Sequence, residues 1–360
     1  MRQLNHSGWL FEQKIEPLSE KWLNKARKRL NSLVKPKGSL GRLEDIAAKV
    51  VAITQNDRPE IEKKAVFVFA ADHGVVEEGV SAYPQDVTKA MVENFLNGIA
   101  GINVLAKSVN ADVYVVDVGV KGDIYRESPY FIKRKIRHGT ENITKASAMS
   151  VEEALEAIKV GIEIADMAKD KGVKMIALGD MGIGNTTPSS ALLCAFLKLS
   201  PEDAVGLGTG IDEAKLRKKI EVVKKALSKN RSIIEEGNPL KILAAIGGLE
   251  IAAICGACIG GVKNRILVLV DGFISCAGAL AAIKINPTVK DYLFFSHISA
   301  EKGHKLFFDK IGESPILNLD MRLGEGTGAA LAMHIVECAI RLYNEMATFE
   351  EVGIKPGHNI

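Results

Sequence analysis

The chain has 360 residues, 47% of them hydrophobic and 25% charged, which is typical of a globular protein with one large domain or two. The net charge of +3 contains no long basic run, and only 6% of residues are aromatic, so nucleic-acid binding is disfavoured. No apolar run follows a basic start, and none reaches the roughly 18 residues of a bilayer span. We therefore expect neither a signal peptide nor a membrane segment.

The cysteine pattern indicates reduced thiols. The odd number of cysteines lies in apolar segments, at Cys194, Cys255, Cys258, Cys276 and Cys338. This usage favours a cytoplasmic protein without disulfides. Cys255 and Cys258 have the spacing of a redox pair, but the surrounding Gly, Ala and Ile residues favour tight helix packing instead.

The sequence of residues 1–60 predicts two helices, at 19–34 and 41–54, joined by a Pro/Gly loop. From residue 65 onward, short β-rich runs alternate with helical segments. We expect the strands at 65–74, 113–119, 174–182, 266–272, 292–299 and 315–326, with a further candidate at 204–212. Continuous apolar strands that alternate with helices predict an α/β fold with a parallel sheet covered on both faces.

The domain organisation follows from the same pattern. We expect residues 61–328 to form the large catalytic domain, and residues 1–60 to pack with a C-terminal helix and tail (329–360) in a smaller, mainly helical domain. The final helix is expected at 329–347. The last residues, from 355, predict a loose tail.

Polar residues follow the expected strands at the edge where parallel sheets bind ligands. They are Asp72, His73, Asp117, Asp180, Asp271, His297, Ser299 and Glu325. For His297, a buried histidine satisfied by neighbours is the alternative to a ligand-binding role.

Residues 177–197 carry the strongest phosphate signal. The strand reaches Asp180, and Gly182, Gly184, Asn185 and Thr186 lead into a helix, whose N-terminus can bind an anion. The stretch matches neither a Walker A loop nor the dinucleotide G-x-G-x-x-G pattern. A capped helix after a tight turn is the alternative.

A second glycine turn begins at 206 and precedes a lysine-rich helix, with Asp212 as its expected N-cap. The pattern by itself favours a solvated amphipathic helix, and the alternative is that Lys219 or a neighbouring lysine reaches a phosphate. The loop after His73 carries Ser81, Tyr83 and Gln85. These side chains suit a flat neutral ligand better than a metal.

The segment 324–328, Gly-Glu-Gly-Thr-Gly, joins a strand to a long helix. Glycines allow close approach of the backbone to a ligand, and a carboxylate in a partly dry setting is a better proton acceptor. Glu325 is therefore a candidate general base. A helix-capping acid is the alternative.

Taken together, "KPKGSLGRLE", "EGVSAYPQDVT", "GDMGIGNTT", "GTGID", "GGLEIAAICGA", "LVDGF" and "LNLDMRLGEGTGAALA" resemble the nicotinate-nucleotide:dimethylbenzimidazole phosphoribosyltransferase family over roughly residues 30–350. The resemblance implies a Rossmann-like homodimer that activates the lower ligand of cobalamin with no cofactor or metal. It implies that Glu325 is the catalytic base.

By the same resemblance, further residues take expected roles. Asp180 stands where the family commonly has Glu. Its side chain is one methylene shorter, so a catalytic role in direct proton transfer would need a shift or a bridging water. The resemblance implies phosphate and ribose contacts at Gly182, Lys219, Gly272 and Ser299, and the anion site expected from the residues adds Gly184, Asn185 and Thr186. The benzimidazole pocket is expected near Ser81, Tyr83, Gln85 and Leu323.

Two other function classes stay open at this point. One is a metal-dependent transferase that uses phosphoribosyl pyrophosphate, which would need paired acids beside the phosphate loop. The other is a non-catalytic binder of benzimidazoles or their ribosides, which would not need Glu325.

Overall fold

The computed structural model describes residues 8–11, 14–208 and 210–355. The expected tail from 355 lies almost wholly outside these residues. Six parallel strands form one sheet in the order β3-β2-β1-β4-β5-β6. They are β1 (Lys64–Ala71), β2 (Ala111–Gly119), β3 (Phe131–Lys133), β4 (Met175–Met181), β5 (Leu267–Val270) and β6 (Leu293–Phe295). The chain order reverses direction between β1 and β4, which is the switch point where doubly wound sheets bind ligands.

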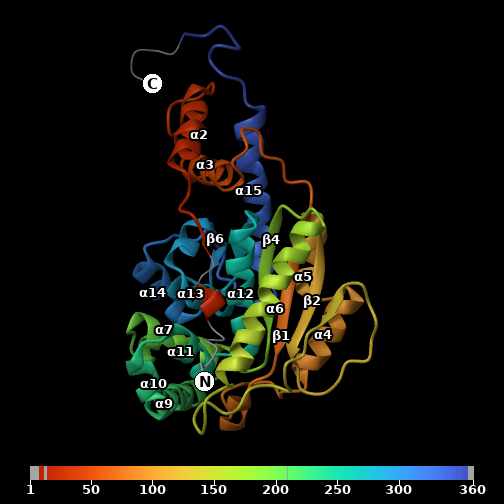
Figure 1. The fold of residues 1–360 in the computed structure, drawn as a ribbon, viewed down its shortest axis with the longest axis vertical. Coiled ribbons are helices and arrows are strands. Elements are labelled where there is room, and N and C mark those ends of the chain that lie inside the picture. Colours follow the sequence, from red (N-terminus) through yellow and green to blue (C-terminus); the bar gives the residue numbers. More distant parts are fainter. Residues whose placement is uncertain (1–7, 12–13, 209, 356–360) are drawn as a thin grey trace.

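Helices surround this sheet and extend beyond it (Figure 1). The longer ones are α2 (Glu20–Ser32), α3 (Arg42–Thr54), α4 (Val87–Asn97), α5 (Gly101–Ser108), α6 (Val151–Asp170), α7 (Thr186–Leu197), α9 (Glu213–Lys229), α11 (Pro239–Ile246), α12 (Leu249–Lys263), α13 (Phe273–Ile285), α14 (Lys302–Ile311) and α15 (Thr327–Glu345). Shorter elements are α1 (Gly8–Phe11), η1 (Gly74–Glu78), α8 (Pro201–Ala204), α10 (Arg231–Glu236) and η2 (Pro287–Tyr292).

The two faces of the sheet are covered by different helices. α12 packs across the central strands with α13 beside it, and α4, α5 and α15 pack on the sheet from the other side. The α/β fold expected from the alternating strands and helices is confirmed, as is the Rossmann-like parallel sheet that the resemblance implied. The strands are almost fully buried, which explains why they appear in the sequence as continuous apolar runs.

The small residues of α12 permit close helix packing. Every residue from Leu249 to Val262 is buried, and α6 lies directly on α12. A Cβ added to Gly256 would lie only 1.9 Å from the Ile158 carbonyl oxygen. All five cysteines are free. The packing explanation for Cys255 and Cys258 therefore agrees with the structure.

Two strand expectations near the site were wrong. Residues 204–212 form no strand in their described part, because Ser200 caps the short helix α8 and glycines in left-handed conformations follow. Of 315–326, only β8 (Leu317–Asn318) is extended, and it pairs with β7 (His297–Ile298) outside the main sheet. The short edge strand β3 was not expected.

The narrow end of the molecule contains α2, α3 and the end of α15 (Figure 1). Arg29 Nε donates to the Tyr343 carbonyl at 2.8 Å, and Leu33 pairs with Thr348 in an antiparallel bridge. We propose that these segments form the smaller domain, as residues 1–60 and 329–360 were expected to do.

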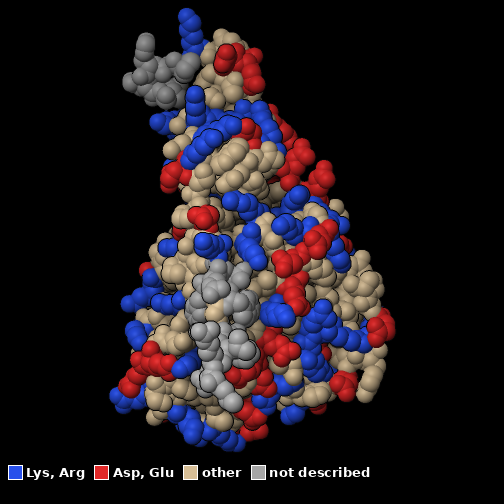
Figure 2. All heavy atoms as spheres, in the orientation of Figure 1, with Lys and Arg blue, Asp and Glu red and all other residues tan. Residues whose placement is uncertain are grey.

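Basic and acidic side chains are interspersed over the face drawn in Figure 2, in keeping with the small net charge. Within the described ranges, no helix is long and apolar enough to span a bilayer.

Candidate active site

A cavity of about 130 Å³ opens beyond the carboxyl ends of β4, β5 and β6. Its lining includes many of the residues expected to contact substrates: Ser81, Asp180, Gly182, Gly184, Asn185, Thr186, Gly272, Ser299 and Leu323. Glu301 and Arg322 also line it and were not expected from the sequence. The sheet edge thus brings together residues from widely separated parts of the chain, as the strand-end rule predicts.

The turn before α7, residues 182–186, has the geometry of an anion-binding site and is called the anion turn below. Gly182 lies so close to β1 that an added Cβ would be 2.3 Å from the Ala71 carbonyl oxygen. Gly184 has φ +89°, a conformation that favours glycine. No side chain caps the N-terminus of α7. Its amide dipoles are therefore available to a phosphate.

Lys219 supplies a positive charge beneath this turn. Its Nζ donates to Thr186 Oγ1 at 2.7 Å and to the Gly206 carbonyl at 3.2 Å. The residue is fully buried, and burial lowers the pKa of Lys219 to about 8. Glu301, whose Oε1 accepts a hydrogen bond from the Gly208 amide at 2.7 Å, partly offsets this effect.

Asp180 ends β4 inside the cavity. Its Oδ2 accepts a hydrogen bond from Asn185 Nδ2 at 3.0 Å, and its buried Oδ1 has no partner among the described residues. Burial, reinforced by Asp271 and Glu250, raises the pKa of Asp180 to about 8. The Asp180 carboxyl is therefore largely protonated at neutral pH and can donate a hydrogen bond through Oδ1.

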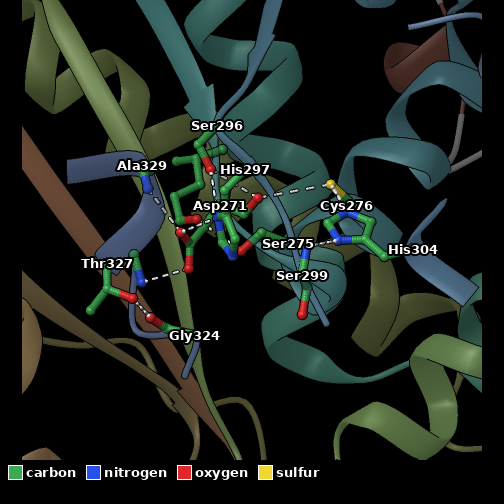
Figure 3. Close-up of polar contacts among 12 residues, drawn as sticks. Asp271, Ser275, Cys276, Ser296, His297, Ser299, His304, Gly324, Thr327 and Ala329 are labelled. Carbon is green, nitrogen blue, oxygen red and sulfur yellow. Dashed lines mark hydrogen bonds and ion pairs between the residues drawn. The ribbon is translucent and has the colours of Figure 1, made fainter. Parts of the chain in front are cut away.

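The hinge before α15 has an unusual backbone. Gly324, Glu325 and Gly326 all have positive φ, at +84°, +63° and +93°. Such a conformation costs a non-glycine residue roughly 1–2 kcal/mol. Asp271 stabilises this strained backbone, because its carboxylate accepts hydrogen bonds from the Gly326 and Ala329 amides, both at 2.9 Å (Figure 3).

The Glu325 side chain points to the N-terminus of α5. Its Oε2 accepts a hydrogen bond from the Ile102 amide at 3.1 Å, whereas Oε1 has no partner among the described residues. Only 5% of the residue is exposed. Burial raises the pKa of Glu325, although the Ile102 amide acts in the opposite direction. A raised pKa makes the carboxylate a stronger base.

Glu325 also acts as a helix cap, but on α5 rather than on the helix that follows it in the chain. Glu325 does not cap α15, whose N-cap position is Gly326, but its carboxylate binds the second amide of α5. One carboxylate oxygen thus anchors the side chain, and the other is free for proton transfer.

Only some of the residues expected to bind the benzimidazole lie at the cavity. Ser81 and Leu323 line the cavity, but Tyr83 and Gln85 do not. Tyr83 is 55% exposed. Gln85 binds the His73 carbonyl at 3.1 Å and the Lys121 ammonium at 3.3 Å. A base-binding role for these two residues stays a prediction.

Asp72 and His73 are buried, and their side chains bind other parts of the protein rather than line the cavity. Asp72 Oδ2 accepts from the Lys121 amide at 2.7 Å, and His73 Nε2 pairs with Glu250 Oε1 at 2.7 Å. In the described part of the chain, no group of three or more His, Cys, Asp or Glu residues is placed to hold a metal ion.

The sheet order, the anion turn at the switch point and the buried carboxylates define a Rossmann-like enzyme that binds a small phosphorylated substrate. Comparison with known proteins is more specific. A model of the family described as phosphoribosyltransferase matches residues 15–354, so the chain belongs to this phosphoribosyltransferase family.

Relatives from three bacteria carry the same full name, nicotinate-nucleotide–dimethylbenzimidazole phosphoribosyltransferase. The one from Geotalea uraniireducens is 52% identical over 96% of this chain and 97% of its own length. The one from Chlorobaculum tepidum is 48% identical over 94% and 96%. The crystal structure of the enzyme from Thermus thermophilus superposes with a TM-score of 0.88 at 44% identity, covering 94% of this chain and all of that one.

Proposed function

We propose that the protein transfers the 5-phosphoribosyl group from nicotinate mononucleotide to 5,6-dimethylbenzimidazole or a related base. The products are α-ribazole 5′-phosphate and nicotinate, in the assembly of the nucleotide loop of cobalamin. The relatives named for this reaction match nearly the whole chain at about half identity. The observation in this chain that supports the reaction best is the half-free carboxylate of Glu325, which directly follows Gly324 in the lining of the cavity that contains the anion turn.

The donor binds through its phosphate. The turn at Gly182–Thr186 and the ammonium of Lys219 hold the 5′-phosphate, while Gly272 and Ser299 lie against the ribose. This binding energy positions C1′ for attack. Because the leaving group departs as a neutral pyridine nitrogen, no general acid is required at that atom.

The acceptor attacks through a ring nitrogen. Its lone pair forms the new bond to C1′ as the bond from C1′ to the nicotinate nitrogen breaks, and that electron pair stays on nicotinate. Positive charge develops on the imidazole ring and makes its other N–H acidic. Glu325 Oε1 takes this proton. General-base catalysis of this kind typically increases the rate by about 10²–10⁴-fold. Attack opposite the leaving group inverts C1′ and gives the α-riboside.

Asp180 supports this step as a neutral acid. It lies beside the hinge, since a Cβ on Gly324 would be 3.4 Å from Asp180 Oδ2. A protonated Asp180 avoids a second negative charge next to Glu325 and can donate to substrate. A charged Asp180 would compete with Glu325 as the base.

The assembly and location are also proposals. The side chains of Ile99 and Val104 on and before α5 are 67% and 61% exposed, an apolar surface that a second subunit of a homodimer would cover. Five free cysteines favour the cytoplasm.

Incubation with nicotinate mononucleotide and several bases, followed by chromatography, tests the activity. We expect a benzimidazole riboside 5′-phosphate and one equivalent of nicotinate. Binding of the base without release of nicotinate would reject a transferase and favour a simple binder.

A further inference from the structure

His297 is a buried side chain at the cavity to which the mechanism above assigns no role. It is 1% exposed and lines the cavity beside Gly272. Its Nδ1 lies 3.1 Å from Ser296 Oγ and 3.6 Å from Asp271 Oδ1. Figure 3 shows the ring next to both residues.

The neighbours of Nδ1 indicate which nitrogen of the neutral ring carries the hydrogen. Ser296 Oγ donates its one proton to the Asp271 carbonyl at 3.1 Å, so the hydroxyl faces Nδ1 with a lone pair. The Asp271 carboxylate is an acceptor as well, because it receives the Gly326 and Ala329 amides. Two acceptors around Nδ1 mean that Nδ1 carries the hydrogen.

The opposite ring nitrogen is left without a partner. With Nδ1 protonated, a neutral ring presents the lone pair of Nε2, and no described residue donates a hydrogen bond to it. The ring is also fixed in place. A Cβ on Gly328 would lie 1.9 Å from Nδ1, and a Cβ on Gly272 would lie 3.2 Å from Cε1.

Because His297 lines the cavity, a ligand bound there can supply the donor that Nε2 lacks. The available donor chemistry follows from position. His297 lines the same cavity as the anion turn, which holds a phosphate in the proposed function, and it lies against Gly328, three residues after Glu325, where the reaction occurs. The part of a nucleotide that joins these two regions is the ribose, whose hydroxyl groups are its hydrogen-bond donors.

We infer that His297 Nε2 accepts a hydrogen bond from a ribose hydroxyl of the nucleotide donor. Asp271 and Ser296 hold the ring in the required tautomer. The inference rests on the proposed function for the identity of the nucleotide. Because Asp271 also fixes the hinge, one carboxylate orients both the group that holds the sugar and the group that takes the proton.

The test combines two variants with donor analogues. Asparagine in His297→Asn can replace Nδ1 but does not reach the Nε2 position, whereas the glutamine of His297→Gln does. Each enzyme is assayed with nicotinate mononucleotide and with its 2′-deoxy and 3′-deoxy analogues. His138→Asn, at a histidine outside this cavity, is the control.

We expect His297→Asn to lower kcat/KM for the natural donor by about 10–100-fold, as for loss of one hydrogen bond to a buried group. His297→Gln retains most of the activity. Removal of the contacted hydroxyl lowers wild-type kcat/KM by a similar factor but has little further effect on His297→Asn. The analogue that shows this coupling identifies the hydroxyl as 2′ or 3′.

Two results would overturn the inference. One is an equal loss with deoxy donors in wild type and His297→Asn, which means that the two changes are independent. The other is a fall in thermal midpoint with the same activity loss for all three donors, which indicates a structural role alone. If wild type releases no nicotinate, the proposed function fails separately, and calorimetric binding of the three donors to wild type and His297→Asn still decides the role of His297.

Discussion

Glu325 Oε2 accepts a hydrogen bond from the backbone amide of Ile102, 223 residues earlier in the chain, at 3.1 Å. The contact joins the strained hinge before α15 to the N-terminus of α5. It holds the carboxylate without using both of its oxygens. Several consequences of this arrangement, and of the buried charges around it, are open to measurement.

Glu325→Gln separates proton transfer from anchoring. The glutamine oxygen can still accept from the Ile102 amide, but the side chain cannot take a proton. We expect kcat to fall by about 10²–10⁴-fold with a thermal midpoint near that of wild type. Glu325→Ala loses the anchor as well, and a cap of this kind typically contributes about 0.5–2 kcal/mol of stability.

The pH dependence of Glu325 gives an independent check. Because burial raises the pKa of Glu325, the rate should fall with decreasing pH at a value above the ordinary glutamate range. Glu325→Gln should lack this acid limb. A variant that keeps both the rate and the limb would mean that Glu325 is not the base, and Asp180 would then be examined.

Gly101→Ala probes the position of the Glu325 carboxylate. An added Cβ would lie 3.3 Å from Glu325 Oε2 and 3.1 Å from Leu323 Cδ2, so both side chains must shift slightly. We expect kcat to fall about tenfold, since small misplacements of a reacting group are costly, while the helix itself is not destabilised. Ser108→Ala at the other end of α5 is the control. Equal kcat values for the two variants would show that the contact does not position the base.

Lys219 should make donor binding dependent on pH. Its pKa is lowered to about 8, so the ammonium is lost as pH rises through that value, and the KM for nicotinate mononucleotide should rise there. Lys219→Met should raise this KM far more than the KM for the base and should remove the pH dependence. Lys215→Met, at an exposed lysine of the same helix, is the matched control. A similar rise in both KM values would argue for general misfolding.

Asp180 should lower stability at neutral and higher pH. Its pKa is raised from an unfolded value of 3.8 to about 8. The folded protein therefore holds a proton that the unfolded chain releases, and the free energy of unfolding should decrease as pH rises between these values. Each tenfold change in proton affinity corresponds to about 1.4 kcal/mol.

Asp180→Asn should remove this contribution. Denaturant titrations from about pH 4 to about pH 9, which span the two pKa values, should show a flatter profile for Asp180→Asn than for wild type. The variant should be the more stable protein at the alkaline end. Asp203→Asn, at an exposed acid, should follow wild type. Parallel profiles for wild type and Asp180→Asn would mean that Asp180 is ionised in the folded protein.

Turnover should survive EDTA. Neither the leaving pyridine nor the acceptor base needs a metal to neutralise charge in the proposed reaction. Complete loss of activity on chelation, restored by Mg²⁺, would instead favour a transferase that uses phosphoribosyl pyrophosphate.

The sequence by itself determined the class of fold and the kinds of residue at the site. Apolar runs such as 65–71 and 266–270 predict buried parallel strands because burial on both faces leaves a local hydrophobic pattern. The glycines of the turn before α7 and of the hinge at 324–326 are local signals too, because positive φ is a property of single residues. These signals failed where the apolar run was short or interrupted by turns, as at β3, 204–212 and 315–326.

Only the tertiary structure decided how these parts act on one another. The sequence marks Glu325 as a carboxylate among glycines, but its partner at Ile102 depends on the packing of α5 against α15. The same holds for the Asp271 carboxylate at the hinge, for the contact of His297 with Ser296 and for the placement of Gln85 away from the cavity. Hydrogen bonds and desolvation act between atoms a few ångströms apart, and which distant residues come that close is set by the order in which strands and helices pack.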